Sequence, residues 1–294
     1  MIKLKPNDKV AVVAPSAQIG SIEKIEKGLA YLHNIGLKPV IGKHTLSQNR
    51  YMAGTDKQRA DDINAAFTDS DIKAIFCVRA AAGASRILPY IDYELALNNL
   101  KPVIGFCDNA ALQIALNKYS QIVSLNGFSL TYDFKNSALD SQIKSDLENL
   151  LFGKKIPIQS GKLLKSGTAE GKLICTNLST LTYLCGTPYF PNLSDSILLL
   201  EDVHEKLHKI DLMLQQLKQQ PNFDKLQGII FGQFTDCTAD SEDGTLSDCF
   251  NDFLYKTDLP AIYDFNFGHT SSRRVLPLGA KVKFSADNAL LEIL

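Results

Sequence analysis

The stretch Pro102–Tyr119, PVIGFCDNAALQIALNKY, decides the fold. An apolar run reaches Gly105, and a pattern of apolar residues three and four positions apart follows the turn directly. This predicts a strand, a tight turn and a helix. Asp108 or Asn109 is expected to cap the helix, which places Cys107 at the positive end of the helix dipole. A thiol in that position ionises more easily.

Two interpretations of Cys107 follow from these residues. The layout resembles the nucleophile turn of α/β hydrolases, although Asn109 stands where the G-x-S-x-G pattern has its second glycine. Alternatively, Cys107 is a buried free cysteine at the end of a strand, which is a common location for this residue. Taken alone, the stretch favours the second interpretation.

The same alternation of apolar runs and helical patterns extends towards the N-terminus. The predicted strands are 9–15, 38–41, 74–78 and 102–105; the predicted helices are 21–32, a helix opening at 54–63 with Thr55 as its N-cap, and 85–100, interrupted by Pro89. Such alternation predicts right-handed βαβ units in a parallel sheet. Ligands of such sheets gather at the carboxyl ends of the strands, where Cys107 is expected.

The second half of the chain is less regular. The predicted elements are a helix at 141–151, strands at 172–175, 197–200 and 228–234, a helix with the apolar stripe Ile210, Met213, Leu214 and Leu217, an apolar run at 262–267, and a strand at 281–284. The interval 153–171 is rich in Gly, Lys and Ser. We therefore expect an N-terminal α/β domain at 1–152, a linker at 153–171 and a C-terminal domain at 172–294.

Composition bounds the class of protein. The chain has 294 residues, a formal net charge of −1, 45% hydrophobic and 21% charged residues, which suits a soluble globular protein with room for two domains. This charge indicates no nucleic acid or membrane partner. No apolar run approaches ~18 residues, and the apolar segment 10–15 is too short for a signal peptide. The six cysteines are widely scattered and form neither a C-x-x-C pair nor a regular zinc spacing, so reduced thiols in the cytoplasm are expected.

One motif suggests a metal. His204-Glu205-Lys206-Leu207-His208 fits H-E-x-x-H, which on a helix places both histidines on one face for zinc. Asp211 and Leu214 stand where the extended motif has Gly and His. A zinc protease is therefore the less favoured alternative. No P-loop is present and no G-x-G-x-x-G follows a strand, so no cofactor is expected.

A thiol nucleophile needs a base, and the base needs an orienting partner. His269 follows Gly268 at the end of an apolar run, and Glu201 ends the apolar run 197–200. Each residue also has a plain interpretation, His269 as a surface histidine and Glu201 as the acid at a helix N-terminus. Spacing alone does not bring Cys107, Glu201 and His269 together.

The order of motifs along nearly the whole chain resembles the LD-carboxypeptidase family, which includes the microcin C immunity peptidases. The motifs are VAVVAPS at 10–16, AGTDKQRADDIN at 53–64, IKAIFCVR at 72–79, SRILPYIDY at 85–93, VIGFCDNAAL at 103–112, TNLSTLTYLCGTPYFP at 176–191, ILLLEDVHEKLHKIDLMLQQL at 197–217, GIIFGQFTDC at 228–237 and FGHTSSRRVLPLGAKV at 267–282.

The resemblance implies a cytoplasmic, metal-independent peptidase that trims the terminal D-alanine from murein tetrapeptides and is usually a homodimer. It implies an N-terminal parallel-sheet α/β domain followed by a C-terminal α/β domain containing a β-barrel. The family's nucleophilic serine falls on Cys107, its glutamate on Glu201 and its histidine on His269. A Cys-His-Glu triad would thus replace Ser-His-Glu.

A second departure concerns the oxyanion hole. The family pattern R-G-G-Y-G falls on Arg79-Ala80-Ala81-Ala82-Gly83. In the family this turn donates an N–H to the oxyanion, together with the residue after the nucleophile, so the donors here are expected near Ala80 and Ala81 and at Asp108. Alanine resists a positive φ, and the loss of one donor costs about 3 kcal/mol. The alternative is therefore a catalytically impaired muropeptide-binding protein of the same fold.

Overall fold

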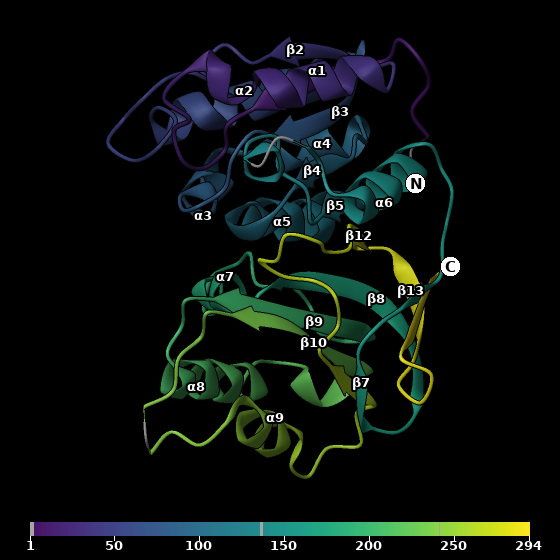
Figure 1. The fold of residues 1–294 in the computed structure, drawn as a ribbon. Coiled ribbons are helices and arrows are strands. Elements are labelled where there is room, and N and C mark those ends of the chain that lie inside the picture. The colour runs from purple at the N-terminus through teal and green to yellow at the C-terminus, as the bar shows by residue number, and fades with distance from the viewer. Residues whose placement is uncertain (1–2, 136–137, 241) are drawn as a thin grey trace. The chain divides into compact units, whose positions relative to one another are not determined.

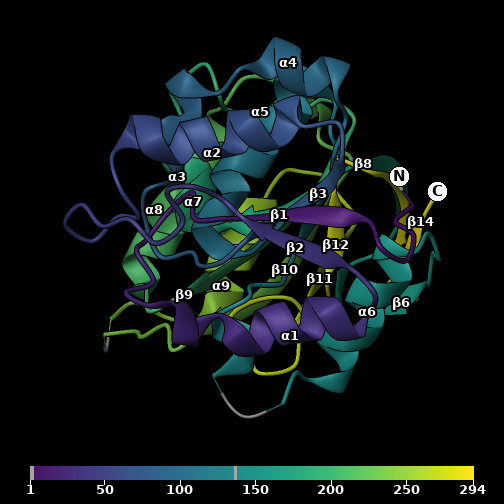
Figure 2. The ribbon, with the colours of Figure 1, turned by 90° about the horizontal axis from the view of Figure 1, so that it is seen from above.

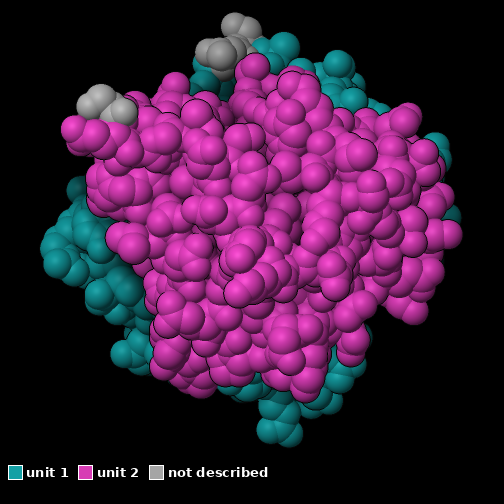
Figure 3. All heavy atoms as spheres, turned by 90° about the horizontal axis from the view of Figure 1, so that it is seen from below, with its two compact units in different colours: residues 1–155, 274–279 teal, residues 156–273, 280–294 magenta. Residues whose placement is uncertain are grey.

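The computed structural model describes residues 3–135, 138–240 and 242–294. It divides into two compact units, residues 1–155 with 274–279 (unit 1) and residues 156–273 with 280–294 (unit 2, magenta in Figure 3). Each unit contains one mixed β-sheet and several helices. The protein is therefore a two-domain α/β protein.

The sheet of unit 1 has the strand order β12-β5-β4-β3-β1-β2. Its strands are β1 Lys9–Val13, β2 Lys38–Ile41, β3 Ile72–Cys77, β4 Val103–Gly105, β5 Ser124–Asn126 and β12 Leu276–Leu278. The strands β1 to β5 pair in parallel, as predicted for β1 to β4, whereas β12 pairs antiparallel with β5. The short LPL sequence of β12 contains a proline, which a strand tolerates at the edge of a sheet and which conceals the strand in a sequence pattern.

Helices cover both faces of this sheet, with α2, α4 and α5 along one face and α1 and α6 along the other (Figure 2). They are α1 Glu26–Asn34, α2 Asp56–Thr68, α3 Ala84–Ile87, α4 Tyr93–Asn98, α5 Ala110–Ser120 and α6 Ser141–Leu151, with 3-10 turns at Ile22–Lys24, Leu88–Tyr90, Cys107–Asn109 and Tyr132–Phe134. Thr55 caps α2 in a capping box with Gln58, which confirms the predicted helix start.

The sheet of unit 2 has the order β6-β14-β13-β8-β9-β10-β11-β7. Its strands are β6 Ile158–Gln159, β7 Lys162–Lys165, β8 Thr168–Asn177, β9 Ser196–Val203, β10 Gly228–Thr235, β11 Ala261–Tyr263, β13 Lys281–Ser285 and β14 Leu290–Ile293. The strands β8 to β11 are parallel and the outer strands antiparallel. The two edge strands are β6 and β7, and closing the sheet into a barrel would require them to pair. Among the described residues they form no hydrogen-bonded pair, so the expected β-barrel stays a prediction.

The interval 153–171 contains strands in this structure. It carries β6, β7 and the first residues of β8, and Gly161 and Gly167 have φ values of 99° and 135° at the turns between them. These turns account for the glycine-rich composition. The limits 1–152, 153–171 and 172–294 remain a prediction.

Helices of unit 2 are α7 Leu178–Tyr183, α8 Leu207–Lys218 and α9 Leu246–Leu254, with a 3-10 turn at Phe223–Lys225, and α8 and α9 lie side by side (Figure 1). The predicted stripe lies on α8, where Ile210, Leu214 and Leu217 are buried. On α9, Phe250 stacks on Phe231 of β10 with ring centroids 3.8 Å apart. Over the described part of the chain, none of the helices combines the length and apolarity needed to cross a membrane.

Candidate active site

The turn after β4 places Cys107 in a strained conformation. Cys107 is half-buried, has a φ of 58° and is the first residue of the 3-10 turn that leads into α5. Non-glycine residues rarely adopt this left-handed region, and such residues cluster at functional sites. A Cβ at Gly105 would lie 2.8 Å from the Cβ of Asn109, so the tight turn requires glycine there. The predicted strand, turn and helix are confirmed.

The predicted helix cap is confirmed in its position but not in its hydrogen bond. Asn109 is the residue before α5, but its side chain makes no capping hydrogen bond. Instead, the Oδ2 atom of Asp108 accepts hydrogen bonds from Ser16 Oγ at 2.6 Å and Ala84 N at 2.7 Å, and Asn109 Nδ2 donates to Ser16 Oγ at 2.9 Å. These contacts turn both side chains towards the neighbouring strand ends, and Asn109 Oδ1, the atom that would cap the helix, has no hydrogen-bond partner among the described atoms.

The turn expected to supply oxyanion donors carries a second strained residue. Ala81 is exposed and has a φ of 106°, and Gly83 has a φ of 126°. Ala80 is half-buried beside them. An L-residue with a Cβ rarely adopts the conformation of Ala81, so the turn keeps a glycine-like shape despite its alanine sequence.

In unit 2 the acid and the histidine lie together. Glu201, on β9, is fully buried, and its Oε2 atom lies 2.9 Å from His269 Nδ1. A proton on Nδ1 is donated to the carboxylate in this arrangement, which leaves Nε2 as the basic nitrogen. The other carboxylate oxygen of Glu201, Oε1, is buried and has no hydrogen-bond partner among the described atoms.

A bulge in β10 shapes this site. The register between β9 and β10 shifts between Phe231 and Phe234, and the N–H of Gln233 in the bulge donates to the carbonyl of Phe267 at 2.8 Å. A Cβ at Gly268, whose φ is 147°, would lie 3.1 Å from Glu201 Oε2. The same Cβ would lie 2.9 Å from the carbonyl oxygen of Gln233, so the positive φ and the close approach to both Gln233 and the carboxylate explain why glycine precedes His269.

Asp202 is a buried residue of the site that the sequence alone did not indicate as functional. Its carboxylate accepts hydrogen bonds from Ser179 N at 2.7 Å and Val203 N at 2.9 Å. Burial raises the pKa of Asp202 to about 6, the bonds to the two backbone N–H groups oppose this shift, and the adjacent Glu201 adds to it. An acidic pair that ends an apolar run is the signal that would have found it.

The expected triad residues belong to different units. Cys107, Asp108, Ala80 and Ala81 lie in unit 1, whereas Glu201 and His269 lie in unit 2. The structure defines the geometry within each half, and the combination of the two halves into one catalytic centre stays a prediction.

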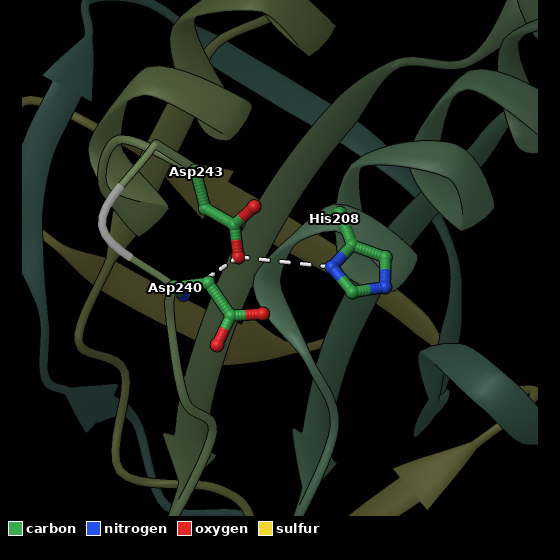
Figure 4. Close-up of side chains that lie close together, drawn as sticks. All are labelled: His208, Asp240 and Asp243. Carbon is green, nitrogen blue, oxygen red and sulfur yellow. Dashed lines mark hydrogen bonds and ion pairs between the residues drawn. The ribbon is translucent and has the colours of Figure 1, made fainter.

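The H-E-x-x-H segment does not form a helical metal site. Helix α8 begins at Leu207, and His204 precedes it with a φ of 59°, so the two histidines do not share a helix face. His208 instead faces Asp243, with 3.7 Å between Nδ1 and Oδ2, and Asp240 lies beside them (Figure 4). Lys206 Nζ pairs with Asp240 at 3.0 Å. This polar cluster of His208, Asp240 and Asp243 is of a kind that is common without an ion.

Comparison with protein families identifies the two halves of the chain. Residues 10–127 match the LD-carboxypeptidase N-terminal domain, and residues 170–284 match the LD-carboxypeptidase C-terminal domain. The chain is 30% identical to the "Probable murein peptide carboxypeptidase" of Bacillus subtilis, over 95% of this chain and 89% of the relative. It is 29% identical to the murein tetrapeptide carboxypeptidase of Pseudomonas aeruginosa, over 92% and 91% of the two chains.

Solved structures show the same fold. The MccF-like protein from Bacillus anthracis superposes with a TM-score of 0.85 at 26% identity, covering 99% of this chain and 98% of the other. The muramoyltetrapeptide carboxypeptidase from Oxalobacter formigenes superposes with a TM-score of 0.88 at 22% identity, covering 97% of both chains. The matches span both units, and the chain therefore belongs to the LD-carboxypeptidase family.

Proposed function

We propose that the protein is an LD-carboxypeptidase that releases the terminal D-alanine from a murein tetrapeptide, with Cys107 as its nucleophile. The hydrogen bond between His269 and the fully buried Glu201 carries this proposal. Burying a carboxylate with one unsatisfied oxygen costs stability, and a histidine oriented by that carboxylate is the base that a nucleophile needs. Relatives named for murein peptides support the substrate class.

The proposed reaction proceeds through a thioester. Cys107 Sγ attacks the carbonyl carbon of the last peptide bond while His269 Nε2 takes the thiol proton. Glu201 stabilises the resulting imidazolium. His269 then returns the proton to the amine of the leaving D-alanine, and a water molecule hydrolyses the thioester.

The negative charge that develops on the attacked carbonyl oxygen needs donors from the protein. In this proposal they are the backbone N–H of Asp108 and the N–H groups near Ala80 and Ala81. No step requires a metal or a cofactor. We also propose, from the family resemblance, a β-barrel in the C-terminal domain and a cytoplasmic homodimer, whose oligomeric state light scattering would measure.

The test is D-alanine release from a murein tetrapeptide, followed by mass spectrometry, with the diastereomer ending in L-alanine as the substrate control. We expect release by the wild type and at least a ~10⁴-fold loss in Cys107→Ala. Cys107→Ser, which restores the family's nucleophile, should retain measurable turnover and lose its sensitivity to iodoacetamide. Folded wild type that releases no D-alanine from any LD-peptide would contradict the proposal.

A muropeptide-binding protein without catalysis is the second candidate. Ala81 favours it because the glycine-like shape of the turn, which must hold an oxyanion donor, is strained when the residue is alanine. Two measurements separate the candidates: the rate of Cys107 alkylation by iodoacetamide near neutral pH, and calorimetric binding of the tetrapeptide. An unreactive thiol together with peptide binding would favour the binding protein.

A further inference from the structure

The side chain of Asp108 connects three strand ends of unit 1. Its Oδ2 atom accepts a hydrogen bond from Ser16 Oγ, which follows β1, and from the N–H of Ala84, which follows β3. Asp108 itself follows Cys107 at the end of β4. One carboxylate oxygen, with contacts of 2.6 Å and 2.7 Å, therefore ties the nucleophile turn to both neighbouring loops.

Asn109 and Arg59 extend these contacts to the turn 79–83. Asn109 Nδ2 reaches the carbonyl of Arg79 at 3.5 Å, at the start of the turn. At its end, Arg59 Nη1 donates to the carbonyl of Gly83 at 2.8 Å, and Arg59 is only 1% exposed. Together with the bond from Ala84 to Asp108, side chains therefore hold both ends of the turn.

The turn needs such external restraint. Ala81 has a φ of 106°, which a Cβ-bearing residue rarely adopts, and a conformation of this kind persists only where the surroundings impose it. The helix that follows, α3, has four residues and supplies little rigidity of its own. The bond to Asp108 fixes the first residue of that helix.

We propose that Asp108 is a positioning residue whose carboxylate sets the turn 79–83 relative to Cys107 and so aims the N–H groups that receive the oxyanion. The proposal rests on the proposed function, because it requires an oxyanion on the carbonyl that Cys107 attacks. It gives the Asp108 side chain a role separate from that of its own backbone N–H.

Two reagents distinguish positioning from reactivity. A tripeptide analogue of the substrate carries an aldehyde in place of the carbonyl of the scissile peptide bond. The Cys107 S–H adds across this C=O: the S–C bond forms, and the carbonyl oxygen takes the proton and becomes the hydroxyl of a hemithioacetal. The charge that develops on this oxygen during the addition needs the oxyanion donors. Iodoacetamide forms the S–C bond by displacing iodide and develops no oxyanion. A misplaced turn should therefore weaken aldehyde binding and leave alkylation unchanged.

We expect Asp108→Ala to lower kcat and aldehyde affinity by about a hundredfold each, with KM and the alkylation rate within about threefold of wild type. Asp108→Asn keeps an acceptor oxygen and should stay within about tenfold of wild type. The amide of Ala84 should exchange hydrogen faster in Asp108→Ala, since it loses its acceptor. The half-buried Cys185 and Cys237 can also react with iodoacetamide. The alkylation rate of Cys107→Ala is therefore measured separately and subtracted.

The matched control is Asp92→Ala, which removes a carboxylate bond to the N–H of Leu95 in the same unit and should change none of these values. Unchanged aldehyde affinity in Asp108→Ala would overturn the proposal. A fall in the alkylation rate as large as the fall in aldehyde affinity, together with a lower melting temperature, would also overturn it, because it would indicate general misfolding. Were the wild type inactive on every LD-peptide, the proposed function would fail. Exchange at Ala84 would still decide whether Asp108 holds the turn: faster exchange supports that role, and unchanged exchange overturns it.

Discussion

The turn around Cys107 and the pair Glu201–His269 are positioned by different means. Cys107 is half-buried in a left-handed conformation, and the polar side chains that follow it hold the turn from the same unit. Glu201 is fully buried in an eight-residue strand, and of its two carboxylate oxygens only Oε2 has a hydrogen-bond partner among the described residues, His269.

The two parts of the site differ in the kind of free-energy cost that the fold must offset. The Cys107 turn stores backbone strain that neighbouring hydrogen bonds offset. The Glu201 site has ordinary strand geometry and instead carries the desolvation of a charge. Mutations at the turn should therefore affect backbone geometry, and mutations at Glu201 should separate activity from stability.

The largest effect is expected for Glu201→Gln. Loss of the charge leaves the His269 imidazolium without its stabilising partner, and in the Ser-His-Asp template the equivalent change lowers kcat about 10⁴-fold. Stability should hold or rise, because the amide removes a fully buried charge. D-alanine release and thermal melting measure the two properties.

Glu205→Gln is the control for this change, because Glu205 follows the same strand and lies outside the hydrogen bond with His269. It should leave kcat unchanged. Equal activity of Glu201→Gln and wild type would show that the buried pair is structural.

A smaller effect concerns pH and Asp202. The pKa of its carboxyl group is about 6 in the folded protein, against 3.8 for an unperturbed aspartate. Between these values the folded state holds the proton that the unfolded chain has released, so the free energy of unfolding falls as pH rises from about 4 to about 6. The contribution is about 2–3 kcal/mol.

Asp202→Asn lacks this titration. Urea unfolding gives the free energy of unfolding of wild type and variant at each pH from 4 to 7. Plotted against pH, the two free energies should converge or cross rather than run parallel. Parallel plots would show that the pH dependence of stability in this range does not come from Asp202.

The smallest effect is expected at the turn itself. Ala81→Gly removes strain of about 1–3 kcal/mol and increases the entropy of the unfolded chain by about 0.5–1 kcal/mol, so it should stabilise the protein by about 1 kcal/mol. Ala82→Gly is the matched control; Ala82 has no positive φ, and its change should destabilise the protein by about 0.5–1 kcal/mol. Denaturant unfolding measures both, and destabilisation by Ala81→Gly would show that Ala81 is unstrained.

Much of unit 1 could be predicted from the sequence because its strands are continuous apolar runs and its helices carry periodic apolar faces. The segments that escaped prediction lack these signals. The strand β12 has three residues and depends on β5 for its pairing, and α9 follows a long polar loop although its buried residues Cys249, Phe250 and Phe253 have helical spacing.

The site divides in the same way. Cys107 and Glu201 were visible because a reactive or charged residue ends an apolar run, and the hydrogen bond between Glu201 and His269 required the fold to join residues 68 positions apart. The partners of Asp108 could not be predicted, since Ser16 lies 92 positions away and competes with the local helix cap. The cap was the nearer choice, and the tertiary contact prevailed.

The edge strand β12 has a consequence for the order in which the protein is made. Leu276 pairs with Asn126, so β5 leaves the ribosome long before the strand that covers it. At typical rates of translation the edge of β5 stays open for about ten to thirty seconds, during which an unpaired strand can pair with another nascent chain. Chaperone demand during synthesis should therefore be high at this edge.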